Sequence, residues 1–144
     1  MCLFINRNSI KKTKKLIEHR KKVSKKNYII AYKAVDQICY KRNKLSMSLK
    51  PIYRVGWGNY EIGENISSRY SAELRPDEIC NGTISYGFHV YLNKKSIDMR
   101  DLYIPVKIYL DDIVSIGHFG REDSLVCTKF TISEKDYNNP KLKS

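Results

Sequence analysis

The sequence predicts an α+β protein, with a basic N-terminal helix followed by a mostly antiparallel, strongly bent sheet or partial barrel and one or two short helices. Residues 10–26 contain no Gly or Pro and carry a thin apolar stripe at helical spacing. The second half of the chain is a succession of β-favouring runs separated by turn residues, without helical patterns between them. The length of 144 residues fits one domain.

The N-terminal helix is expected over residues 10–26. Ser9 is its candidate N-cap and Asn27 its candidate end. One face holds a stripe of apolar and small residues, which Arg20 interrupts: Ile10, Thr13, Leu16, Ile17, Val23 and Ser24. Lysines at i,i+4 spacing repel one another, so this helix should be stable only when docked or bound. The apolar residues 2–5 before it are expected to form a short strand or a hydrophobic staple that packs on the core.

The first half of the body begins with a strand at residues 28–35, and residues 38–40 either continue it or begin another. Shorter strands are expected at 51–55 and 60–63. Residues 64–83 are polar and rich in turn signals.

The second half of the body begins with a strand at residues 83–92, followed by one or two helical turns at 96–102. Pro105 suggests that the next strand lies at an edge or begins there. The last three strands are predicted at 103–110, 113–117 and 124–132.

We therefore expect a basic helical arm at residues 1–27, one α+β domain at 28–136 and a frayed tail at 137–144. No run approaches the ~18 apolar residues of a membrane-spanning helix. At the start, apolar residues precede the charges, which is the reverse of a secretory signal. These features predict a cytoplasmic protein without a membrane partner.

Positive charge is concentrated in the first third of the chain. The net charge is +12. Residues 1–54 hold sixteen Lys and Arg against two acids, whereas residues 55–144 hold eleven against thirteen. A basic segment on a near-neutral body is typical of a protein with a polyanionic partner. The expected partner is nucleic acid or an acidic protein surface.

Twelve cations form the candidate nucleic-acid interface. Nine of them fall within sixteen consecutive positions of the predicted helix, which exceeds what solubility requires. The other three follow the first strand. The set is Lys11, Lys12, Lys14, Lys15, Arg20, Lys21, Lys22, Lys25, Lys26, Lys41, Arg42 and Lys44. The alternative without a binding function is a solvated helix whose lysines only maintain solubility.

Tyrosines are interleaved with these cations between residues 28 and 60. Aromatic rings stack on bases while cations hold phosphates, so the mixture suits a single-stranded or nucleotide ligand. Alternatively, the tyrosines fill a sheet surface with their hydroxyls in water, which explains most of them.

The sequence offers little catalytic chemistry. Cys2, Cys39, Cys80 and Cys127 lack the spacing of a metal site and are expected to be reduced, small buried residues. No phosphate loop, carboxylate pair or catalytic triad is recognisable. We predict no metal, no cofactor and no catalytic residue, and we favour a protein that is not an enzyme.

The start Met1-Cys2-Leu3-Phe4, the early strand around Tyr32-Lys33 and the strand Gly87-Phe88-His89 resemble a loose group of small phage and bacterial proteins. The resemblance covers roughly residues 28–133 and carries no known activity. It implies an accessory protein of a phage or mobile element acting in a host cytoplasm.

A fainter similarity is to the ADP-ribosyltransferase fold. In that fold the ligand pocket would be formed by Tyr32, Lys33, His89 and Tyr91. The acidic residue that the fold places late in the chain would be Glu122. Lys33 departs from the early His or Arg of that fold, and Glu122 falls in a predicted turn.

Three functions follow from these patterns. The first is a non-enzymatic accessory protein that binds a polyanion, nucleic acid or a nucleic-acid-associated host complex, through its basic N-terminal region. The second is a nucleotide-binding or ADP-ribosyltransferase-like domain with its pocket around Tyr32 and His89. The third is an inhibitor that docks on an acidic host protein, which would use the same charges. The sequence does not determine the oligomeric state.

Overall fold

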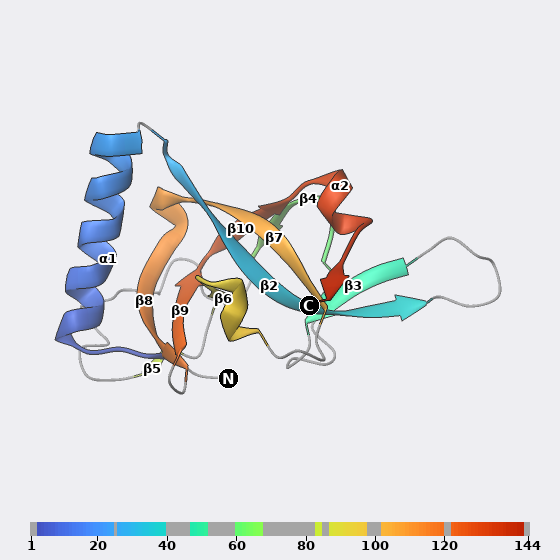
Figure 1. Ribbon diagram of the computed structural model, residues 1–144, viewed down its shortest axis with the longest axis horizontal. Coiled ribbons are helices and arrows are strands. Elements are labelled where there is room, and N and C mark those ends of the chain that lie inside the picture. Colours follow the sequence, from blue (N-terminus) through green and yellow to red (C-terminus); the bar gives the residue numbers. More distant parts are fainter. Residues whose placement is uncertain are drawn as a thin grey trace.

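One long helix lies beside a curved antiparallel sheet in the computed structural model of the chain (Figure 1). The structure describes residues 3–24, 26–39, 47–51, 60–67, 83–84, 87–97, 102–119 and 122–142. The predicted fold class is confirmed: an N-terminal basic helix precedes a bent, open sheet with one further short helix.

The helices are α1, Arg7–His19, and α2, Glu134–Tyr137. A π-helical turn, Arg20–Ser24, continues α1, and 3₁₀ turns cover Lys94–Ser96 and Leu110–Asp112. The strands are β1 Leu3–Phe4, β2 Tyr28–Cys39, β3 Met47–Pro51, β4 Gly63–Ile66, β5 Thr83–Ile84, β6 Phe88–Tyr91, β7 Leu102–Tyr109, β8 Ile113–Phe119, β9 Glu122–Cys127, β10 Lys129–Ile132 and β11 Lys141–Leu142.

The strands follow the order β4-β10-β7-β2-β6-β9-β8-β1-β5, with β3 added to β2 and β11 added to β7. Every pairing between these described strands is antiparallel. The longest strand, β2, begins beside the end of α1 and crosses the molecule to pair with β3 at the far side (Figure 1).

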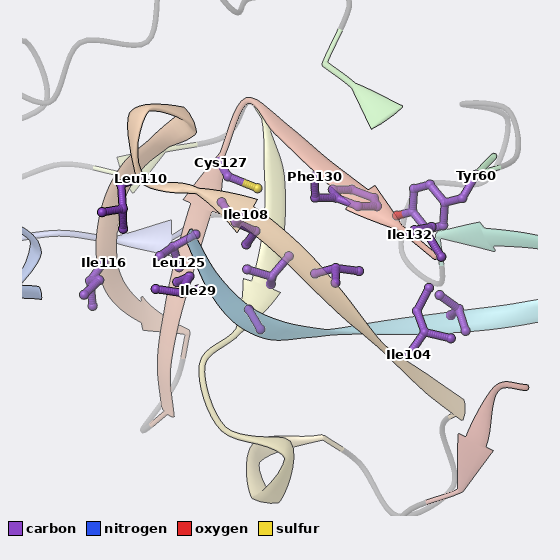
Figure 2. Close-up of a cluster of buried hydrophobic side chains, with 14 residues drawn as sticks. Ile29, Tyr60, Ile104, Ile108, Leu110, Ile116, Leu125, Cys127, Phe130 and Ile132 are labelled. Carbon is purple, nitrogen blue, oxygen red and sulfur yellow. The ribbon is translucent and has the colours of Figure 1, made fainter. Parts of the chain in front are cut away.

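Side chains alternate between the two faces of β2. Ile29, Ala31 and Val35 point to the main core, whereas Tyr32 and Ala34 belong to a separate cluster on the opposite face. The main core lies inside the curve of the sheet and is filled by β-branched, leucine and aromatic side chains from β2, β6, β7, β8, β9 and β10 (Figure 2). These residue types also favour strands, which explains why their runs were recognisable in the sequence.

The beginning of the chain is built into this sheet. Leu3 is fully buried and Ile5 nearly so, in a cluster with Val114 and Val126. The expected short strand at residues 2–5 is therefore found as β1, which pairs with β5 and β8. Residues 1–27, expected as an arm, thus include part of the core.

Several expected boundaries differ from the structure. The strand expected at 124–132 is two strands, because the backbone of Thr128 leaves the ladder. Its N–H donates to the Asp112 carbonyl at 2.9 Å, and its own carbonyl accepts from the Ser67 N–H at 2.9 Å. The strand expected at 83–92 is likewise the separate β5 and β6.

The strand that contains Pro105 was expected to lie at an edge or to begin there, and both alternatives are wrong, since β7 begins at Leu102 and has neighbours on both sides. β7 lies between β2 on one side and β10 and β11 on the other. Pro105 falls between Lys107, which pairs with β10, and Tyr103, which pairs with β11. A residue without an N–H therefore occupies the gap between two ladders. The pairing of Lys141 and Leu142 with β7 also lies in the segment expected to fray.

Candidate nucleic-acid interface

The start of helix α1 is fixed by a capping box. The Asn6 Oδ1 accepts from the Ser9 N–H at 3.0 Å, and the Asn6 N–H donates to the Ser9 Oγ at 3.1 Å. Ser9 is therefore the third helical residue rather than the N-cap, which corrects the expectation from the sequence. Reciprocal bonds of this kind satisfy two donors that a helix terminus otherwise leaves open.

One face of α1 is docked on strand β8. The Thr13 hydroxyl donates to the Ser9 carbonyl at 2.7 Å and accepts from the Ile116 N–H at 2.9 Å. Strand β1 pairs with β8 at His118. Further along the same edge of β8, at Ile116, the acceptor for the backbone N–H is the Thr13 hydroxyl. Leu16 and Ile17, one turn further on, pack against the main core.

The opposite face of α1 and its π-helical continuation is cationic. We call this surface the cationic face; it consists of the exposed residues Lys11, Lys12, Lys14, Lys15, Lys21 and Lys22. Arg20 is half-buried on the docked side. Glu18 is the single acid between Arg7 and Ser24. Within the part of the chain that the structure describes, Lys11, Lys14, Lys15, Lys21 and Lys22 form no ion pair.

The remaining predicted interface residues divide into two groups. Lys26 is exposed and lies two residues before the start of β2. Lys25, Lys41, Arg42 and Lys44 lie outside the described residues.

The outer face of β2 and β7 places aromatic rings and ammonium groups together. Tyr28 and Tyr109 are paired across the two strands, with ring centroids 6.4 Å apart at 73°. The Lys107 Nζ lies 4.2 Å from the Tyr28 ring centroid and 5.1 Å from that of Tyr109. The Lys26 Nζ lies 5.9 Å from the Tyr28 centroid. Ammonium groups at such distances are attracted to the faces of the rings.

Sequence reasoning singled out Tyr28 but missed Lys107 and Tyr109. Both belong to the alternating run at 103–110, and their position 79 or more residues from Tyr28 gave no sign of contact. The pairing of β2 with β7, from Tyr28 opposite Tyr109 to Val35 opposite Leu102, brings them together.

The four residues of the candidate pocket do not meet on one surface. Tyr32 and Tyr91 are paired across β2 and β6 and pack against the cluster of Ala34, Ile97 and Tyr103. Lys33 points to the opposite, core side, where its ammonium donates to the backbone carbonyl of His89. The His89 side chain itself is buried, with 7% of its surface exposed.

The buried Cys127 lies in the main core (Figure 2). Burial raises the pKa of its thiol from 9.0 to about 12, and the charge of Lys33 offsets part of that rise. A thiol with so high a pKa stays protonated at neutral pH and is a poor nucleophile. This residue fits the expected role of a small apolar side chain.

The described residues contain no group of three or more His, Cys, Asp or Glu arranged to hold a metal ion. Among them there is also no helix with the length and apolar character needed to cross a membrane. The chain matches no protein-family model, no curated protein sequence and no solved structure.

Proposed function

We propose that this protein binds nucleic acid through the cationic face of α1. The observation that carries the proposal is the orientation of the helix. Thr13, Leu16 and Ile17 hold one side against the sheet, so the side with Lys11, Lys14 and Lys15 faces solvent. A docked helix presents its charges without the cost of ordering a free arm.

The charge pattern is costly for the protein itself, which supports a role in binding. Lys11 and Lys15 are four residues apart on the helix, and like charges at this spacing destabilise a helix. Phosphates that neutralise these lysines would relieve the repulsion and release condensed counterions. Binding of this kind is independent of base sequence.

A charge-reversal experiment tests the proposal. The variant Lys11→Glu, Lys14→Glu, Lys15→Glu is compared with the control Lys94→Glu, Lys135→Glu, Lys141→Glu, which changes the net charge equally at exposed sites away from α1. Fluorescence polarisation measures the affinity of the full chain for labelled oligonucleotides. Substitution is preferable to removal of residues 1–26, because Leu3 and Ile5 are core residues.

We expect the helix variant to lose more than about tenfold in affinity, because it converts phosphate attraction into repulsion. The control should lose much less, since its changed charges lie away from the contact. Circular dichroism checks that both variants keep their helix. Equal affinity of the two variants would overturn the proposal.

The third function drawn from the sequence, docking on an acidic host protein, gives a different result. The wild-type chain would then bind no oligonucleotide even at low salt, while the same lysines would be required to capture an acidic partner.

The resemblance to small phage and bacterial proteins supports a setting for the proposed activity. We propose an accessory protein of a phage or mobile element, acting in the host cytoplasm. Ultraviolet crosslinking in bacterial cells that express the chain tests this setting. Recovery of crosslinked nucleic acid from the wild type, but not from the charge-reversed helix variant, is the expected result.

A further inference from the structure

The outer face of β2 and β7 presents a second surface beside the end of α1. We call it the tyrosine platform and define it as Lys26, Tyr28, Ile30, Lys107 and Tyr109. Lys26 is exposed, Ile30 is 47% exposed, and Tyr28, Lys107 and Tyr109 are half-exposed. Isolated exposed hydrophobic side chains are ordinary on a protein surface, whereas this surface groups several apolar and aromatic side chains on one face of the sheet.

The geometry of the platform fixes the position of its rings. Strand pairing holds Tyr28 and Tyr109 directly opposite each other, and the ammonium of Lys107, two residues before Tyr109, lies close to both rings. Directly across from Lys107 on β2 is Ile30, whose exposed side chain extends the apolar surface. Tyr32 and Tyr103, with ring centroids 5.9 Å apart, continue the same face toward its more buried end.

The platform is also free of negative charge. The outward-pointing positions of residues 28–34 and 103–109 are tyrosine, isoleucine, alanine, proline and lysine, with no carboxylate. An anion that reaches Lys26 and Lys107 therefore meets no repelling group at the outward positions of these two stretches. The positive charge of Lys26 and Lys107 therefore favours a polyanionic ligand over a protein partner whose surface carries no acidic residues.

The platform begins just after the helical segment that carries the cationic face. Lys26 is four residues beyond Lys22, and Asn27 is held at the end of β7 because its carbonyl accepts from the Leu110 N–H at 2.8 Å. This bond places the exit of the helix segment next to Tyr28 and Tyr109. A strand of nucleic acid that leaves the lysines of the helix would reach the rings next.

We infer that the tyrosine platform stacks unpaired bases, so that the ligand of the proposed site is single-stranded nucleic acid. The inference rests on the proposed function, since the cationic face supplies the phosphate contacts. Bases inside a duplex are stacked on one another and offer no free face to a protein ring. Aromatic rings in a cationic groove bind single strands with little sequence preference, because every base has a π-face.

The test separates stacking from charge with three probes of equal length: a single-stranded thymidine oligonucleotide, an abasic strand with the same phosphates, and a duplex. The variant Tyr28→Leu, Tyr109→Leu keeps apolar side chains but removes both rings. The matched control Tyr28→Phe, Tyr109→Phe keeps the rings. Thermal unfolding verifies that both variants fold.

The wild-type chain should bind the thymidine strand more tightly than the abasic strand, by roughly 5- to 150-fold for each stacked base. The Leu variant should lose that difference and bind the two strands alike, whereas the Phe variant should retain it. Affinity for the duplex should be unchanged by either variant.

Two results would overturn the inference in distinguishable ways. If wild-type protein binds thymidine and abasic strands equally, the rings do not stack bases, although nucleic-acid binding by the helix stands. If it binds none of the three probes, the proposed function fails and the inference fails with it.

Discussion

At the scale of single residues, Cys127 shows how the core determines the chemistry of a side chain. Its thiol is fully buried and its pKa is raised to about 12, with desolvation as the main cause. The pair Val126-Cys127 within a β-favouring run already indicated a buried position, and the structure confirms it. The nearby Lys33 was not expected on the core side, because the sequence paired it with Tyr32 and His89 in a pocket.

The shifted pKa of Cys127 predicts a change of stability at high pH. The thiol ionises near pH 9 in the unfolded chain but near 12 in the folded chain. Its contribution to stability is therefore complete below pH 9 and is lost as the pH rises from 9 toward 12. Urea unfolding of the wild type and of Cys127→Ala at pH 8 and pH 10.5 measures this effect.

We expect the free energy of unfolding to fall more steeply between these two pH values in the wild type than in Cys127→Ala. The alanine variant should be less stable at pH 8 because it leaves a small cavity. Parallel pH dependence in the two proteins would contradict the assignment, since Tyr and Lys titrations are common to both.

At the scale of elements, the docking of α1 on β8 depends on one hydroxyl. Thr13→Val removes the acceptor of the buried Ile116 N–H and the donor to the Ser9 carbonyl. A buried N–H without a partner costs about 1–3 kcal/mol. Denaturant unfolding should show a loss of this size, at nearly constant side-chain volume.

Thr13→Ser is the matched control, because it keeps the hydroxyl and removes only a methyl group. We expect it to lose much less stability than Thr13→Val. A serine variant as unstable as the valine variant would mean that packing, rather than the hydrogen bond to β8, holds the helix.

The helix and most strands were predictable because their signals are local. The part of the predicted stripe that falls in α1 identified its docked face, since Ile10, Thr13, Leu16 and Ile17 are all at least partly buried. The N-cap was misassigned because asparagine and serine are both preferred at that position. Only the hydrogen bonds between Asn6 and Ser9 show that Asn6 is the N-cap. The division between β9 and β10 depends on Thr128, whose partners Asp112 and Ser67 are distant in sequence.

At the scale of the whole molecule, the sequence located the charge but not its surroundings. Six of the predicted cations form the cationic face, and Lys26 belongs to the tyrosine platform. The tyrosine platform needed the pairing of β2 with β7, which a single sequence does not specify. The candidate pocket, in contrast, could have been questioned in advance, because Tyr32 and Lys33 are neighbours in a predicted strand and strand alternation sends them to opposite faces.

The central claim is that lysines on α1 contact phosphates, and the salt dependence of binding tests it most directly. Binding of a single-stranded oligonucleotide is measured over a salt series for the wild type, for Lys11→Gln, Lys14→Gln, Lys15→Gln, and for the control Lys94→Gln, Lys135→Gln, Lys141→Gln. Each phosphate contact contributes about 0.7 to the slope of log affinity against log salt on single strands.

We predict a steep negative slope for the wild type and the control, and a slope shallower by about 2 for the helix variant, which loses three contacts. Equal slopes for all three proteins would contradict the account, because the lysines of α1 would then contact no phosphate.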